Sequence, residues 1–128
     1  MVITEIDGIE LFVNDMETMV KFYRDIIGFK TNWKGEAFTD FETGNCRLRM
    51  YGRNNFENMI SRSFDYPEGL NGTMVIAFQV KTYDEVDKEY KRLMDLGVEC
   101  VFPPATMPWG HRIFLTADPE GNLLEIYA

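Results

Sequence analysis

Carboxylate, guanidinium and aromatic side chains occur at alternate positions of several short segments of this chain. They are Glu10, Phe12, Arg49, Tyr51 and Glu125, and each follows an apolar residue. Because successive side chains of a strand point to opposite faces of a sheet, these residues are predicted to share one face and their apolar neighbours the other. Carboxylates, a guanidinium and aromatic rings on one face can bind a small molecule by ion pairing and stacking.

The residue types needed for nucleophilic or multi-histidine metal chemistry are scarce. His111 is the only histidine, and Cys46 and Cys100 lie far apart with no second ligand at metal spacing. A histidine-based triad or a multi-histidine metal centre therefore cannot be assembled within one chain. The cysteines are predicted to be inert thiols in or near a core, and His111 to be exposed or structural.

Three further binding candidates lie near the end of the chain: Trp109, Arg112 and Phe114. Trp109 follows Pro108 at the mouth of an expected strand, where an indole can either stack on a flat ligand or anchor the loop by packing. Arg112 and Phe114 are expected to face the same side as Glu125.

Length and charge exclude several classes of function. The chain has 128 residues, the size of a single domain, and 13 Lys and Arg against 21 Asp and Glu give a net charge of −8. This balance disfavours nucleic acids and anionic membrane surfaces as partners. The beginning of the sequence has no signal-peptide pattern, so we expect a cytoplasmic protein.

The elements that position these residues occur twice. Residues 9–13 alternate like a strand and are followed by helical spacing up to Gly28; residues 76–80 alternate likewise and are followed by helical spacing up to Gly97. Further strand-like segments lie near 29–34, 37–42 and 46–51 in the first half and near 98–102, 111–117 and 122–127 in the second. Each half therefore reads as β-α-β-β-β.

Both predicted helices begin with a capping pattern. Asn14 with Glu17, and Thr82 with Glu85, pair a side chain that can accept from the first amides with a glutamate three residues later. The sequence thus predicts an α+β fold. Tandem β-α-β-β-β modules are expected to form a cupped, barrel-like mixed sheet with the helices outside.

The modules are predicted to form a single domain, with module one at residues 1–52, a connector at 53–72 and module two at 73–128. The connector is polar, with one helical turn near residues 57–62. Each sheet has a helix on one face only, so its other face needs the second half or another subunit, and we expect a homodimer. Two curved sheets brought together leave a cavity for a small-molecule ligand.

Two motifs resemble the vicinal oxygen chelate superfamily, which includes glyoxalase I, bleomycin resistance proteins and extradiol dioxygenases. Residues 22–29 read FYRDIIGF, and the end of the chain carries PWGHR followed by DPEGNLLE. The ending is most similar to the antibiotic-binding branch. The resemblance covers the chain apart from residues 52–72.

The resemblance implies four metal-ligand positions, which fall at or next to Gly8, Arg49, Val75 and Glu125. Glycine and valine side chains offer no donor atom and arginine is cationic, so one carboxylate remains. We therefore expect no metal and no other cofactor. Arg49 is predicted either to pair with Glu125 in place of a metal or to be an exposed strand charge.

Three functions follow from this reading. The first is a metal-free binding protein that sequesters a small aromatic or cationic compound in the cupped cavity. The second is a metal-dependent enzyme, a lactoylglutathione-lyase-like lyase or isomerase or a dioxygenase, with Glu10 and Glu125 as the surviving candidate residues. The third is a dimerising interaction module without a ligand.

Overall fold

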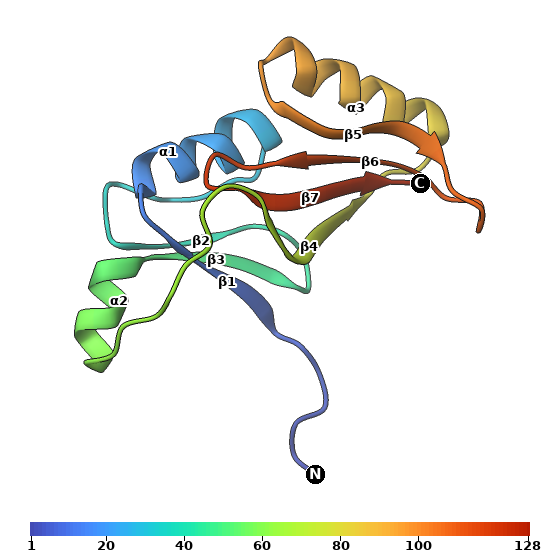
Figure 1. Cartoon of the computed structure of the whole chain (residues 1–128). Helices are drawn as coiled ribbons and strands as arrows, with labels where there is room; N and C mark the ends of the chain where they lie inside the picture. Colours follow the sequence, from blue (N-terminus) through green and yellow to red (C-terminus); the bar gives the residue numbers. More distant parts are fainter. The chain divides into compact units, whose positions relative to one another are not determined.

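The computed structural model describes residues 1–128, which divide into two units, Met1–Asp65 and Tyr66–Ala128. The boundary falls inside the predicted connector, and each unit is described by itself below (Figure 1). No helix in either unit has the length and apolar character that crossing a membrane requires.

The first unit contains a sheet of three strands. Its elements are β1 (Gly8–Val13), α1 (Met16–Lys21), the π-helix η1 (Phe22–Ile27), β2 (Phe38–Phe41), β3 (Arg47–Gly52) and α2 (Arg53–Ile60). The π-helix η1 directly continues α1. The strand order is β1-β3-β2, with β1 parallel and β2 antiparallel to β3. The helix of α1 and η1 runs on one side of this sheet (Figure 1).

The core of the first unit lies between this helix and the sheet. On the sheet, the buried residues are the alternate ones: Leu11, Val13, Thr39, Phe41, Leu48, Met50 and Gly52. The helix contributes Met19, Val20, Phe22 and Tyr23, and the ring centroids of Tyr23 and Phe41 lie 6.0 Å apart. The alternation predicted for β1 and β3 is therefore present, and their remaining side chains lie on the open face.

The second unit has the predicted β-α-β-β-β order. Its elements are β4 (Asn71–Gln79), α3 (Tyr83–Asp95), β5 (Glu99–Thr106), β6 (Arg112–Ala117) and β7 (Asn122–Tyr127). The strand order is β4-β7-β6-β5, and only the β4–β7 pair is parallel. Val86 and Leu93 of α3 are buried, and the helix contacts β5, β6 and β7.

The first unit departs from the predicted order in two places. Residues 29–34 form no strand; instead Lys30 accepts a backbone hydrogen bond from Glu42, and the Thr31 hydroxyl donates to the Asp40 carbonyl. Gly35, at φ +102°, turns the chain between this segment and β2. The connector contains the helix α2 rather than one turn near residues 57–62. The α+β class is confirmed, but the first module has three strands.

The helix caps match the prediction at one helix and miss it by one residue at the other. The Thr82 hydroxyl accepts from the Glu85 amide at 3.2 Å, as predicted. At α1 the cap is Asp15 rather than Asn14: Asp15 Oδ1 accepts from the Thr18 amide at 3.1 Å, and Oδ2 accepts from the Thr18 hydroxyl at 2.8 Å. A carboxylate at this end also interacts favourably with the helix dipole.

Replacing Asp15 with alanine is expected to lower thermal stability at neutral pH but not in acid. Hydrogen bonds from Thr18 lower the pKa of the Asp15 carboxyl below its usual value. A carboxyl with a lowered folded-state pKa stabilises the fold above its unfolded pKa, and this contribution disappears as the pH falls through the folded pKa. In thermal denaturation at a series of pH values, the melting temperatures of the wild type and Asp15→Ala should converge as the pH falls below the pKa of Asp15. Glu5→Ala, which removes an exposed charge before β1, should match the wild type throughout.

Candidate functional site

The open face of the first unit carries two neighbouring rows of side chains. The strand register places Arg49 of β3 between Glu10 of β1 and Asp40 of β2. Two residues further along, the same register aligns Phe12, Tyr51 and Phe38. We call these the charged row and the aromatic row. They lie about 7 Å apart along the strands, and they include the predicted residues Glu10, Phe12, Arg49 and Tyr51.

The charged row belongs to a network that also includes Asp7 and Arg47. Arg47 contacts Asp40 at 3.1 Å and Asp7 at 3.3 Å, and Arg49 contacts Asp7 at 3.8 Å. Two buried atoms of this network, Asp40 Oδ1 and Arg49 Nε, have no hydrogen-bond partner. With Glu10, three carboxylates face two guanidinium groups, so the network is net negative and retains hydrogen-bonding capacity for a polar group.

The aromatic row is extended by side chains from α2 and the segment after it. The ring of Phe12 lies 4.6 Å from Phe56 and is stacked at 6.4 Å on Phe64. Tyr51 lies 5.4 Å from Phe56 and 5.6 Å from Phe38. Phe38 and Phe64 remain about two-fifths exposed, so the cluster leaves ring surface for a further flat group to contact.

Sequence reasoning missed part of this face, namely Asp40, Phe56 and Phe64. The connector reads as polar, and its two phenylalanines do not form an alternating pattern. The signal that was available is Phe56 with Met59 and Ile60, apolar residues at the three- and four-residue spacing of a helix face.

The second unit also has an open face, formed by β4, β7 and β6. The register aligns Ala77 with Glu125 and Leu115, so the Glu125 carboxylate lies in an apolar row. Two residues further along β7, Tyr127 contacts the ring of His111 at a centroid distance of 5.2 Å. The predicted residue Glu125 therefore lies on the open face.

Trp109 is the most exposed of the predicted binding residues, with 68% of its surface accessible. Its Nε1 donates a hydrogen bond of 3.0 Å to Nδ1 of His111. Through His111 the indole is linked to the Tyr127 end of the open face.

Arg112 and Phe114 do not belong to this face, so the prediction that they face the same side as Glu125 is wrong. Phe114 is fully buried and its ring lies 5.3 Å from Tyr90 of α3. Arg112, two residues earlier, forms an ion pair of 2.9 Å with Asp87 of the same helix. Ile113 pairs with Tyr127 and Phe114 with Ile126, so the open-face residues of β6 are the odd-numbered ones.

The four positions implied for metal ligands do not provide a ligand set. A Cβ atom at Gly8 would lie 2.5 Å from the carbonyl oxygen of Arg47, so the backbone leaves no room for a ligating side chain. Val75 has no donor, and Arg49 is a cation paired with Asp7. No group of three histidine, cysteine, aspartate or glutamate side chains in either unit is placed to hold a metal ion. These residues do not fit a divalent metal ion. Cys46 and Cys100 are both exposed and do not lie in a core.

The predicted pairing of Arg49 with Glu125 joins residues of different units. Arg49 belongs to the first unit, where its ion-pair partner is Asp7. The pairing stays a prediction.

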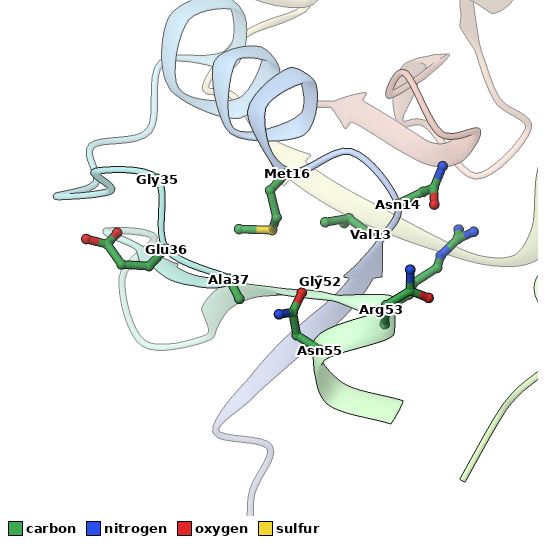
Figure 2. A pocket seen from close by; sticks show the side chains of 10 residues that line it. Val13, Asn14, Met16, Gly35, Glu36, Ala37, Gly52, Arg53 and Asn55 are labelled. Atoms are coloured by element: carbon green, nitrogen blue, oxygen red, sulfur yellow. The ribbon is translucent and has the colours of Figure 1, made fainter. Parts of the chain in front are cut away.

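A separate pocket of about 390 Å³ lies in the first unit, at the carboxyl ends of the parallel strands β1 and β3. Figure 2 shows the side chains that surround it, among them Asn14, Met16, Glu36, Arg53 and Asn55. Arg53 Nε donates to the Phe12 carbonyl at 3.3 Å, which ties the start of α2 to β1. The lining is rich in amides and has no aromatic ring, so a flat ligand is better matched by the aromatic row.

A family model and a sequence relative both match nearly the whole chain. The family model described as Glyoxalase/Bleomycin resistance protein/Dioxygenase superfamily matches residues 5–126. The uncharacterized protein YraH of Bacillus subtilis (strain 168) is 29% identical over 123 residues, which cover 93% of this chain and 94% of YraH.

Solved structures share the fold. A glyoxalase/bleomycin resistance protein/dioxygenase from Nocardioides matches with a TM-score of 0.84 and 26% identity, covering 100% of this chain and 85% of that one. A lactoylglutathione lyase from Agrobacterium tumefaciens matches with a TM-score of 0.77 and 22% identity, covering 99% of this chain and 95% of that one.

Proposed function

Because the chain belongs to the glyoxalase/bleomycin resistance protein/dioxygenase superfamily, we propose that it is a metal-free member that binds a small aromatic or cationic compound. The binding residues are Glu10, Phe12, Arg49 and Tyr51 on the open face of the first unit. On the second unit they are Trp109 and Glu125. We expect the protein to act as a homodimer, because each sheet keeps an open face, which in the first unit is contacted by α2 at the Phe12 and Tyr51 end.

One observation carries the proposal: the charged row and the aromatic row are neighbours on the same face. Arg49 pairs in register with Glu10 and Asp40, and Tyr51, two residues on, with Phe12 and Phe38. A planar ring gains stacking energy of about 0.5–1.5 kcal/mol per aromatic contact beyond its buried area. A polar substituent on the same molecule reaches the charged row at the distance of two strand residues.

The charges favour a cation as that substituent. The network of Asp7, Glu10, Asp40, Arg47 and Arg49 has one carboxylate in excess, and Asp40 Oδ1 is a buried acceptor without a donor. Aromatic faces also attract cations within about 6 Å of the ring. The net charge of −8 on the whole chain steers cations toward it.

The donor set supports the metal-free part of the proposal. Of the four positions that the resemblance to this family implies, Glu125 alone has a side chain that can ligate a divalent ion. The close approach of the Arg47 carbonyl to Gly8 means that the first position cannot regain a ligand without a backbone shift.

The test combines metal analysis with ligand screening. Purified protein is incubated with zinc, nickel, manganese and iron, freed of excess metal and analysed by mass spectrometry, and we expect far less than one ion per chain. The metal-free protein is then titrated with phenethylamine, phenethyl alcohol and butylamine, and thermal stability is followed. Phenethylamine should stabilise most; saturating ligand at 100 Kd adds about 2.7 kcal/mol.

A pair of charge-matched variants localises the binding. Glu10→Gln should weaken phenethylamine binding while leaving phenethyl alcohol unaffected, because it removes one carboxylate from the charged row. Glu17→Gln removes the same charge from the exposed side of α1, where Glu17 pairs with Lys21, and should leave both affinities unchanged. Equal effects of the two variants, or no stabilisation by any of the three probes, would contradict the proposal. One tightly held ion per chain would instead favour a metal-dependent lyase, isomerase or dioxygenase.

A further inference from the structure

Trp109 and His111 form a side-chain pair in the turn between β5 and β6. The indole Nε1 donates to His111 Nδ1 at 3.0 Å, and the imidazole packs on Tyr127 of β7. Both members of the pair are exposed, with 68% of Trp109 accessible. His111 is therefore the one hydrogen-bonding partner that this structure gives the Trp109 side chain.

The backbone of this turn is held by other bonds. The Met107 amide donates to the His111 carbonyl at 2.7 Å, and the Gly110 amide donates to the Met107 carbonyl at 2.9 Å. The Tyr83 hydroxyl of α3 donates to the Gly110 carbonyl. Loss of the indole–imidazole bond therefore frees the Trp109 side chain without opening the turn.

We propose that neutral His111 is a positioning residue that holds Trp109 at the Tyr127 end of the open face, and that protonation of His111 releases the indole. An indole nitrogen can only donate, so the facing imidazole nitrogen must offer a lone pair. When that nitrogen takes a proton from solvent, both groups become donors and the hydrogen bond is lost. Histidine is the side chain whose charge ordinarily changes between about pH 5 and 8.

The ionisable groups that surround His111 come from three elements. Tyr127 of β7 packs on the His111 ring, and the Tyr83 hydroxyl of α3 donates to the Gly110 carbonyl of the turn. Arg112, the next residue, is paired with Asp87 of α3 on the opposite face. Glu125 is the charged side chain on the same face of β7, two residues from Tyr127.

The direct test is the pH dependence of the two indole N–H resonances in ¹⁵N-labelled protein. The Trp109 signal should move in one step between about pH 8 and 5 as its hydrogen bond is lost. The other indole is an internal control: Trp33 Nε1 donates to the Glu36 carbonyl at 2.7 Å. The Lys34 amide lowers the pKa of the Glu36 carboxyl, so this signal should stay constant. Trp33→Phe identifies the two signals.

Two variants test whether the hydrogen bond from Trp109 to His111, rather than the mere closeness of the two rings, holds the indole. In His111→Asn the amide oxygen can accept in place of Nδ1 but does not titrate, so the Trp109 signal should keep its neutral-pH position throughout. In His111→Phe the acceptor is missing, and the signal should stay at the low-pH position. A wild-type signal that does not move, or a step that persists in His111→Asn, would overturn the inference.

The consequence for ligand binding rests on the proposed function. If Trp109 contacts the ligand, affinity for phenethylamine should fall between pH 8 and 5 in the wild type and stay constant in His111→Asn. Because the indole resonances are measured without ligand, failure of the positioning inference and failure of the binding proposal give different results. A moving indole signal with no binding by any probe contradicts the proposed function alone.

Discussion

Replacing Gly8 with histidine is expected to destabilise the protein without giving it a metal ion. A Cβ atom at this position would lie 2.5 Å from the carbonyl oxygen of Arg47 and 3.3 Å from its carbonyl carbon and Cβ. These are backbone and adjoining atoms of the paired strand β3, which cannot rotate away. Forcing an extra group into such a contact costs about 1–3 kcal/mol, and the Arg49 and Val75 positions would still offer no ligand.

Urea denaturation of Gly8→His and Gly8→Ala measures this effect. Both variants should lose about 2 kcal/mol, because the clash begins at Cβ. Gly72→Ala in β4 is the matched control: nothing lies within 4 Å of its Cβ position, so it should be neutral or more stable by about 0.4–1 kcal/mol. A Gly8→His protein of unchanged stability that retains one zinc ion per chain would contradict both the packing argument and the metal-free proposal.

The largest loss of stability is expected for Gly121→Ala, at about 3 kcal/mol or more. Gly121 has φ +88°, and the carbonyl group of Gly69 occupies the space that a Cβ would need. The Asn71 amide also donates to the Gly121 carbonyl at 2.7 Å, so the segment that enters β4 is held against this turn. Alanine would add left-handed strain and push this segment away.

A variant at Gly97 distinguishes the cost of left-handed backbone strain from the cost of the contact with Gly69. Gly97 has φ +80° after α3, but its Cβ position is open, so Gly97→Ala should cost about 1 kcal/mol from strain alone. If Gly121→Ala and Gly97→Ala lose the same free energy of unfolding, the contact with Gly69 does not contribute to the cost of the Gly121 substitution. Because Gly121 immediately precedes β7, which carries Glu125, its replacement should also weaken ligand binding in the screening assay.

The elements that sequence patterns predicted well are those with a clear local signal. On β1 and β3, charged or aromatic residues alternate with apolar ones, and the structure places Glu10, Phe12, Arg49 and Tyr51 on one face. Thr82 caps α3 because a capping residue and a glutamate three positions later satisfy the free amides locally.

Errors arose where the local signal was ambiguous. Ile113 and Phe114 of β6 are both apolar, so alternation does not say which faces the helix; packing against Tyr90 of α3 places Phe114 there. Asn14 and Asp15 are both good capping residues, and the extended backbone of Asp15, at φ −120°, decides which one caps α1. Residues 29–34 have strand-like composition, but isolated hydrogen bonds rather than a ladder join Lys30 and Thr31 to residues 40–42.

The sequence by itself determined the paired α+β modules and the residue types available for chemistry. That Gly8, Arg49 and Val75 offer no metal donor follows from the residues alone, since a missing ligand atom cannot be supplied by folding. Tertiary structure decided which groups meet. Strand register brought Asp40 beside Arg49 and the Arg47 carbonyl against Gly8, and α2 brought Phe56 onto Phe12. Such contacts depend on how distant segments align, and that alignment has no signature within any one segment.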